Sequence, residues 1–334
     1  MDALFGNETE RIPVWFMRQA GRYLPAYSAL KKSLSIKEIA ADTGLSAEVS
    51  YAPVRELGVD AAIIFSDIML PSVSMGFQVD FVESVGPMVT NPIEDRMPRW
   101  ATGYIPSADH MSAGKSISEF KKRYPRVPVI GFSGGPMTIC SYLFAGKSDK
   151  DLSVCRRKLS SNPALVKEAM SLVTEAVLEN VADQIRQGAD AIQIFDSWAT
   201  SLSHDPFVDY FSNFAGVIPS ELGSSKVPFI YFTLNSAHHL KEFRESDYNC
   251  LSVDWKQNLR EVADTLGPSK SVQGNLDPEI AREGGENAIF TTGRILDSMK
   301  GRPGFVFNLG HGVQPETNPA TLKSIVSMVH RYGH

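Results

Sequence analysis

The sequence is poor in cysteine and has no long apolar run. Its 334 residues include three cysteines, Cys140, Cys155 and Cys250, and none of them forms a CxxC pair. So sparse and odd a set predicts no disulfide framework and fits a reducing compartment such as the cytoplasm. Because no stretch of about 18 apolar residues occurs, we expect no transmembrane helix. The segment Met1–Glu10 carries acids and no apolar core, so we expect no signal peptide.

Signatures of metal and cofactor chemistry are also missing. The sequence contains no HExxH motif, no Cys₂His₂ spacing, no P-loop and no GxSxG elbow. His238 and His239 are adjacent and therefore point in different directions, which makes them a poor metal pair. The net charge of −5 argues against a bulk nucleic-acid partner. We therefore predict no metal site and a small-molecule partner.

Short apolar runs alternate with helix-length segments along the whole chain. Runs of this kind suit strands that are buried on both faces of a parallel sheet. Alternation with helices predicts an α/β protein, a single (β/α)₈ TIM barrel that forms one domain over residues 1–334. The alternative is a doubly wound open sheet, but no GxGxxG follows the first run. The predicted strands are Pro13–Phe16, Ala61–Phe65, Val127–Phe132, Ala191–Phe195, Val227–Phe232, Leu251–Val253, Ser271–Gln273 and Phe305–Phe307.

Capping residues mark several of the predicted helices. Ser35 with Glu38 three residues later fits a capping box, which begins a helix that runs to Leu57 and is broken near Gly44. Asn-Pro or Asp-Pro pairs begin three further helices, after Asn162, Asp277 and Asn318.

The segment after the second predicted strand is the longest gap between strands. It contains Gly76–Phe81, in which apolar and polar residues alternate, followed by Gly86–Val89. This pattern predicts a β-hairpin inserted after the second strand.

Polar and glycine-rich residues recur where the predicted strands end. In a barrel these ends meet at one face, where function is found. We therefore expect the site to form from the segments Met17–Arg22, Ser66–Asp67, Ser133–Thr138, Asp196–Trp198, Asp254–Trp255, Gly274–Pro278 and Asn308–Gly312.

One of these segments is strongly basic in a chain of negative net charge. From Arg11 to Lys32 no Asp or Glu interrupts Arg11, Arg18, Arg22, Lys31 and Lys32. Guanidinium groups match carboxylates or phosphates with two parallel hydrogen bonds, so an anionic ligand is indicated. A solvated basic face is the alternative, but Arg18 and Arg22 follow a buried strand and flank a glycine.

Other candidate residues each have a structural alternative. Asp67 follows an apolar strand, where a carboxylate is either functional or a helix N-cap. His311 lies between Gly310 and Gly312, which favours close approach of a ligand, although a lone histidine is often structural. By itself Tyr142 reads as core, and Ser197 as a helix cap.

These motifs resemble those of the uroporphyrinogen decarboxylase family along nearly the whole chain. The most specific match is Pro13–Pro25, which is similar to that family's N-terminal signature. Further matches in order and spacing are Ala61–Ile68, Gln193–Ser197, Gln273–Pro278 and Asn308–Gly312.

The resemblance implies the removal of carbon dioxide from the four acetate side chains of uroporphyrinogen, giving coproporphyrinogen. It also implies a homodimer and neither metal nor organic cofactor. Arg18 and Arg22 would hold substrate carboxylates, and Asp67 would accept hydrogen bonds from the pyrrole NH groups. We expect Asp67, Arg18 and Arg22 to be catalytic, and the proton donor stays open between Arg18, Tyr142, His311 and water. The substrate-binding set would be Arg18, Gln19, Ala20, Gly21, Arg22, Asp67, Phe132, Tyr142, Ser197 and His311.

Two other functions compete with this interpretation. A zinc-dependent methyltransferase would share the fold, but the three cysteines offer no His-x-Cys pair. A protein that binds porphyrinogens without acting on them would not need the complete set of candidate residues.

Overall fold

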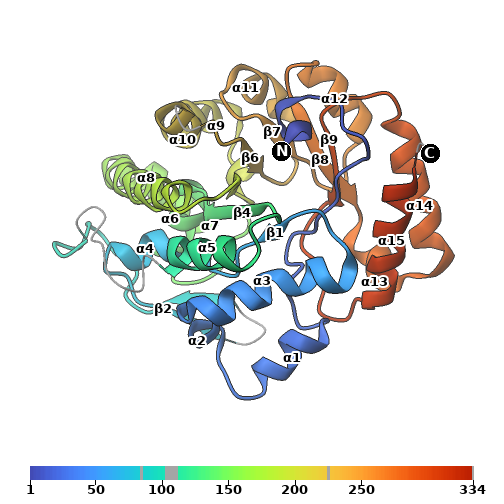
Figure 1. Cartoon of the computed structure of the whole chain (residues 1–334). Coiled ribbons are helices and arrows are strands. Elements are labelled where there is room, and N and C mark those ends of the chain that lie inside the picture. The colour runs from blue at the N-terminus through green and yellow to red at the C-terminus, as the bar shows by residue number, and fades with distance from the viewer. Residues whose placement is uncertain (83–85, 102–111, 224–225, 333–334) are drawn as a thin grey trace.

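A parallel β-sheet forms the centre of the molecule. The computed structural model describes residues 1–82, 86–101, 112–223 and 226–332. In these residues seven strands pair in the order β1-β4-β5-β6-β7-β8-β9, with every neighbouring pair parallel (Figure 1). The strands are β1 (Ala62–Ile63), β4 (Val129–Gly134), β5 (Ala191–Phe195), β6 (Phe229–Phe232), β7 (Cys250–Ser252), β8 (Ser271–Leu276) and β9 (Phe305–Leu309). They correspond to seven of the predicted strands, with ends shifted by a few residues.

The remaining predicted strand, Pro13–Phe16, is not a regular strand. It forms a single parallel bridge, between Val14 and Phe307 of β9. On this side Phe307 N donates to Pro13 O at 2.8 Å, and on the other side Asp60 N donates to Val14 O at 2.8 Å. The segment thus lies between β9 and the start of β1, although its pairing is too short to count as a strand.

Helices surround the sheet and connect successive strands (Figure 1). Each crossover brings the chain back to begin a parallel neighbour, so the carboxyl ends of the strands meet at one end of the sheet. The α-helices are α1 (Pro25–Lys31), α2 (Ile36–Ala41), α3 (Thr43–Leu57), α4 (Leu70–Ser74), α5 (Ser112–Arg123), α6 (Pro136–Ala145), α7 (Ser153–Ser161), α8 (Pro163–Arg186), α9 (His204–Tyr210), α10 (Val217–Leu222), α11 (Leu240–Glu245), α12 (Leu259–Leu266), α13 (Pro278–Glu283), α14 (Gly285–Ser298) and α15 (Pro319–Arg331). No helix in the described ranges is long and apolar enough to cross a membrane.

The predicted helix starts are confirmed. Ser35 and Glu38 form a reciprocal capping box at α2, and the break near Gly44 occurs at Asp42, which caps α3. The side chains of Asn162, Asp277 and Asn318 cap α8, α13 and α15, with proline in the first turn of each helix. Local capping chemistry therefore sets these boundaries.

A second, two-stranded sheet lies between β1 and α5 in the sequence. Its strands β2 (Val79–Val82) and β3 (Gly86–Val89) pair antiparallel, from Val79 opposite Val89 to Val82 opposite Gly86. They fall in the segment for which the alternating pattern predicts a hairpin, and residues 83–85 between them lie outside the described residues.

The interior of the main sheet contains polar side chains that form hydrogen bonds with one another. Trp15 Nε1 donates to Gln273 Oε1 at 2.7 Å, and Gln273 Nε2 donates to Ser252 Oγ at 3.0 Å and Gln193 Oε1 at 3.1 Å. All four residues are buried. These bonds tie β5, β7 and β8 to the segment before Arg18 and offset the cost of burying amides.

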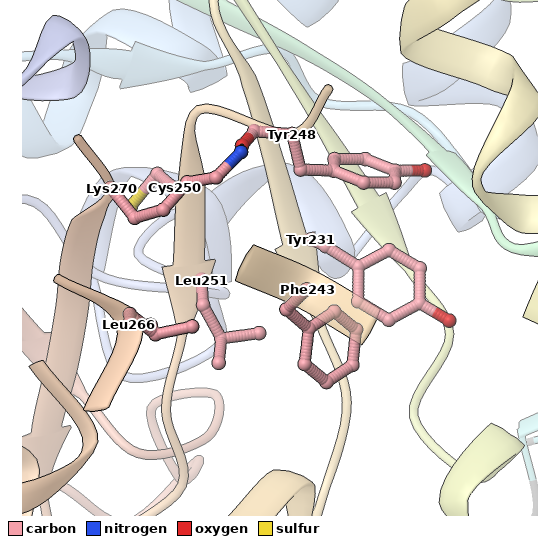
Figure 2. A pocket seen from close by; sticks show the side chains of 7 residues that line it. All are labelled: Tyr231, Phe243, Tyr248, Cys250, Leu251, Leu266 and Lys270. Atoms are coloured by element: carbon pink, nitrogen blue, oxygen red, sulfur yellow. The ribbon is translucent and has the colours of Figure 1, made fainter. Parts of the chain in front are cut away.

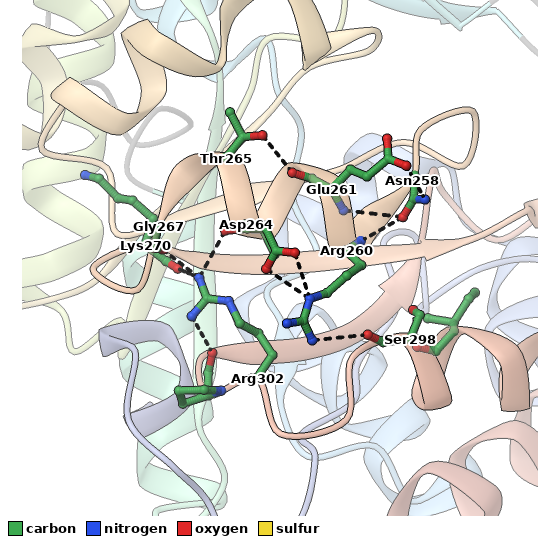
Figure 3. A network of polar contacts seen from close by, with 12 residues as sticks. Asn258, Arg260, Glu261, Asp264, Thr265, Gly267, Lys270, Ser298 and Arg302 are labelled. Carbon is green, nitrogen blue, oxygen red and sulfur yellow. Dashed lines mark hydrogen bonds and ion pairs between the residues drawn. The ribbon is translucent and has the colours of Figure 1, made fainter.

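The amino-terminal end of the sheet is built for packing. Figure 2 shows a cavity of about 10 Å³ near the starts of β7 and β8, which is at the lower limit for a single water molecule. Its lining is Tyr231, Phe243, Tyr248, Cys250, Leu251, Leu266 and Lys270. Nearby, the Arg302 guanidinium donates to the carbonyl oxygens of Gly267 at 2.6 Å and Lys270 at 2.9 Å (Figure 3). These contacts join the end of α12 to the chain entering β9.

Candidate active site

Arg18 follows the Val14 bridge in a constrained backbone conformation. Its φ is 59°, in the left-handed region, and the flanking backbone is held by Asn308 and Val313. Met17 N donates to Asn308 Oδ1 at 3.1 Å, and Val313 N donates to Met17 O at 2.8 Å. β9 and the loop after it therefore fix the start of the Arg18 loop. These contacts offset the conformational free energy that the unusual φ of Arg18 costs.

The Arg18 guanidinium has no ion-pair partner in the described part of the chain. The side chain is accessible to solvent, yet enough protein surrounds it that desolvation lowers its pKa, with nearby Tyr142 opposing the change. The Arg18 guanidinium is therefore available to an anion from solution.

Asp67 lies beyond the end of β1 and before α4. Its Oδ1 accepts a hydrogen bond from Met69 N at 2.7 Å, which orients the carboxylate. Burial raises the pKa of Asp67 to about 6, against the opposing effects of Met69 N and the Lys37 charge. The carboxylate is therefore ionised at neutral pH and is held in a place where its charge is poorly solvated. Ile68 N also hydrogen-bonds the carboxylate, so the backbone of the two residues after Asp67 holds it in place.

Tyr142 on α6 connects these two groups. The ring is 6% exposed, and burial raises its pKa, with Asp67 acting in the same direction and Arg18 against it. Ser148, in the loop after α6, hydrogen-bonds the phenol. Tyr142 therefore lies within the electrostatic reach of both Asp67 and Arg18, and is not simply a core residue.

His311 is a neutral hydrogen-bond donor. Its Nδ1 accepts from Gly312 N at 2.8 Å, so the proton of the neutral ring is on Nε2. Desolvation, followed by the charges of Arg18 and Lys150, lowers the pKa of His311 to about 4. At neutral pH the ring can donate one hydrogen bond to a ligand but carries no charge.

A row of aromatic rings crosses the ends of the strands beside His311. Phe132 of β4 contacts Phe195 of β5 edge to face at 5.6 Å between centroids, and Phe195 contacts Phe232 of β6 at 5.9 Å. Phe232 in turn contacts His311 at 5.7 Å. The row joins Phe132 to His311, and within it Phe132 and Phe232 are buried and Phe195 is half-buried.

Other predicted residues have different surroundings. The Gln19 side chain is fully buried, with Oε1 accepting from Phe16 N at 3.0 Å and Nε2 donating to Ala61 O at 2.9 Å. Both polar ends of Gln19 are thus engaged in holding the loop to β1. Arg22 is exposed. It lies close enough to Tyr27 that its charge opposes the rise in the Tyr27 pKa that burial causes. Ala20 and Gly21, between these two side chains, are half-buried.

Ser197 is the second residue after β5 and is half-buried. The cap predicted as its alternative role is not formed, because the short helix η2 (Ala199–Ser201) has no side-chain cap. Ser197 O accepts from Leu234 N at 3.2 Å, which ties its backbone to the chain after β6.

The sequence did not identify Lys150 or Ser148 as candidates. Both lie in the loop between α6 and α7, away from any strand end, and Ser201 Oγ donates to Lys150 O at 3.3 Å. The basic pair Lys147 and Lys150 was the available signal, but only the fold places this loop beside Tyr142 and His311.

Asp254, after β7, and the three cysteines are enclosed within the protein. Asp254 is fully buried, and accepts from Gln257 Nε2 at 2.6 Å and Lys256 N at 2.8 Å. Cys140, Cys155 and Cys250 are free and buried. Within the described ranges no three His, Cys, Asp or Glu side chains are grouped so that they could hold a metal ion.

Comparison with known proteins agrees with these motifs. The sequence model of the family described as uroporphyrinogen decarboxylase (URO-D) matches residues 1–332. Relatives named uroporphyrinogen decarboxylase include one from Thermoplasma acidophilum, 37% identical over 98% of this chain and 97% of its own. Another, from Picrophilus torridus, is 38% identical over 97% of this chain and 96% of its own.

A solved structure is also similar in fold. The methyltransferase from Methanosarcina mazei superposes with a TM-score of 0.82 over 99% of this chain and 97% of its own, at 19% identity. So low an identity supports the fold alone. Because the family model spans nearly the whole chain and the relatives match over nearly their full lengths, the chain belongs to the uroporphyrinogen decarboxylase family.

Proposed function

We propose that this chain removes carbon dioxide from the four acetate side chains of uroporphyrinogen III, giving coproporphyrinogen III in tetrapyrrole (haem) biosynthesis. The observation that carries the proposal is that the Arg18 guanidinium, which has no ion-pair partner among the described residues, and the half-buried Asp67 carboxylate both act on the buried Tyr142 ring. A ligand with many carboxylates and ring NH donors complements both groups.

In this proposal the cations hold the substrate side chains. Arg18 and Arg22 bind carboxylates, and Lys150 adds a third positive charge on the side of His311. The side chain and the backbone of Gln19 are both engaged within the protein, so Gln19 holds the loop in place, and Ala20 and Gly21 contribute through the backbone of the loop. Tyr142, Ser197 and His311 contact the acetate or propionate groups, and Phe132 packs against the macrocycle.

Asp67 is proposed to make the pyrrole a workable electron sink. A proton is added to a ring carbon, and the ring becomes a cation whose NH groups donate to the Asp67 carboxylate. The bond to the departing carboxylate then breaks, carbon dioxide leaves, and the bonding electrons neutralise the ring. A second proton converts the exocyclic methylene to a methyl group, and loss of the proton first added to the ring carbon restores the neutral pyrrole, so that one proton is consumed for each carbon dioxide released. A fixed carboxylate aimed at the cation supplies electrostatic stabilisation, typically about 3–4 kcal/mol.

The protonation state of His311 reduces the number of candidate donors for the first proton. With a pKa of about 4, this ring is neutral at pH 7 and is a weak acid there. We therefore assign His311 to hydrogen bonding, and the donor to Arg18, Tyr142 or water.

The wider assembly follows the same proposal. Residues 13–16 act as the eighth strand of a closed (β/α)₈ barrel with the β2–β3 hairpin inserted after β1, and residues 1–334 form one domain. Backbone bonds of this segment to Phe307 and Asp60 support closure. We further propose a homodimer in the cytoplasm that needs no cofactor, and the buried free cysteines suit a reducing compartment.

One experiment separates this function from its rivals. Purified protein is incubated anaerobically with uroporphyrinogen III, and the products are resolved by their number of carboxyl groups. Stepwise loss of carboxyl groups, unaffected by chelators, is expected. Binding without turnover would indicate a porphyrinogen-binding protein, and activity that depends on stoichiometric zinc would favour a metal enzyme. Light scattering over a range of concentrations tests the dimer.

A further inference from the structure

Asp196 is a fully buried carboxylate at the end of β5, directly before Ser197. No Lys, Arg or His forms an ion pair with it in the ranges that the structure describes. It is held by neutral donors. Thr138 N donates to Oδ1 at 2.8 Å, and Tyr231 OH donates to Oδ2 at 2.8 Å. Tyr210 OH donates to the same Oδ2.

The donors of Asp196 come from different elements. Thr138 is in the first turn of α6, Tyr231 is on β6, and Tyr210 ends α9. Tyr210 OH also accepts from Met137 N at 3.0 Å. The first turn of α6 is therefore held by two hydrogen bonds, one to Asp196 and one to Tyr210. Burial raises the pKa of Asp196, while its hydrogen bonds act in the opposite direction.

The loop that leads into α6 is pressed against Asp196. A Cβ added to Gly135 would be 2.3 Å from Asp196 Cγ, so only glycine permits this approach. Gly135 N donates to Phe195 O at 2.8 Å, and Gly134 N donates to Ile68 O at 3.1 Å. The loop therefore contacts both the end of β5 and the segment beside Asp67.

This arrangement reaches the site through α6. Thr138 and Tyr142 are four residues apart on one helix, and therefore lie on the same face one turn apart. Fixing Thr138 N fixes the direction in which Tyr142 projects. Ser197 is bonded directly to Asp196, so the same carboxylate sets its position.

We propose that Asp196 is a positioning residue, which places Tyr142 and Ser197 opposite Asp67 for the decarboxylation proposed above. It acts through these two side chains and does not touch the substrate. The inference rests on the proposed function for its kinetic consequence, but its structural consequence can be measured without turnover.

The test compares Asp196→Asn in the wild type and in the Tyr142→Phe/Ser197→Ala background. In the wild-type background we expect kcat/KM to fall by roughly 10²-fold, mainly in kcat, as is typical of a small displacement of catalytic groups. In the double-variant background the further fall should be under about 2-fold, because the groups through which Asp196 acts are already gone. Tm should fall by similar amounts in both backgrounds.

Tyr231→Phe is the milder companion variant, because it removes one donor without changing shape. It should reduce kcat/KM less than Asp196→Asn and remain folded. Thr174→Val is the matched control, because Thr174 Oγ1 is buried in α8 and donates to Met170 O of the same helix. We expect a lower Tm and unchanged kcat/KM for this control.

Crystal structures of Asp196→Asn and Tyr231→Phe give a readout independent of turnover. A displaced Tyr142 ring in both is expected. An unmoved ring, or equal losses of kcat/KM in the two backgrounds, would overturn the positioning role and assign Asp196 to stability alone. If the wild type fails to convert uroporphyrinogen while the ring still moves, the proposed reaction fails and the positioning of Tyr142 stands.

Discussion

Gly312 and Arg18 are in direct contact across the site. A Cβ built on Gly312 would lie 2.4 Å from Arg18 Cδ and 2.7 Å from Arg18 Cγ. The middle of the arginine side chain thus rests on the backbone after β9, where a larger residue has no room. The segment that contains Gly312, nearly 300 residues away in the sequence, therefore determines the direction in which the Arg18 guanidinium points.

Replacing Gly312 with alanine should misplace Arg18 without unfolding the protein. The glycine is not in the left-handed region, so alanine causes little backbone strain there, and the three atoms nearest to the added methyl all belong to the Arg18 side chain. We expect kcat/KM to fall by roughly 10²-fold with a small change in Tm. Gly223→Ala is the matched control, because nothing lies within 4 Å of its Cβ position. Equal activity of the two variants would contradict the Arg18 assignment.

Asp67→Asn should raise stability while it abolishes turnover. The folded-state pKa of Asp67 is about 6, above its ordinary value near 3.8, so its contribution to stability is present below that ordinary value and is lost as pH rises through about 6. The amide avoids this loss. The Tm of Asp67→Asn should therefore exceed that of wild type at pH 8, with the difference vanishing near pH 4. Glu168→Gln, at an exposed site on α8, controls for the loss of one charge.

The loss of kcat/KM at acidic pH should be caused by protonation of Asp67 and not of His311. Protonation of Asp67 near pH 6 removes the charge that stabilises the ring cation, so kcat/KM should decline below that pH. His311 titrates only near pH 4. In His311→Gln the decline should stay near pH 6 at lower overall activity. Nitrogen NMR should find the Nε2–H tautomer of His311 at pH 7, and an imidazolium there would contradict the assignment.

Much of the site could be predicted because its residues follow strands in the sequence. Arg18, Asp67, Ser197 and His311 each come within a few residues of a strand or strand-like segment, and parallel strands bring their carboxyl ends together. Lys150 was missed because it follows a helix, and only folding of the α6–α7 loop brings it toward His311.

Two outcomes depend on contacts that a local pattern does not show. Gln19 lies in the predicted motif, and its side-chain amide is engaged by Phe16 N and by Ala61 O, 42 residues away. The Pro13–Phe16 run has the composition of a strand, but its pairing is limited to one bridge, between Val14 and Phe307. The contacts with Ala61 and Phe307 join segments that are distant in the sequence, so local pattern could not predict them.

Two arginines at the amino-terminal end of the sheet should affect the stability of the protein and leave its activity unchanged. Arg302 donates to three carbonyls at the end of α12, of Ala263, Gly267 and Lys270, whereas Arg260 pairs with Asp264 on the surface of the same helix (Figure 3). Losing charged hydrogen bonds to half-buried carbonyls costs roughly 1.5–3 kcal/mol. An exposed pair four residues apart contributes about 0.3–0.5 kcal/mol. Urea unfolding should therefore show a much larger loss of stability for Arg302→Ala than for Arg260→Ala. Both should keep wild-type kcat/KM, because the reacting groups lie at the opposite end of the strands. A selective loss of activity in Arg302→Ala at temperatures where it is fully folded would contradict this division between the two ends.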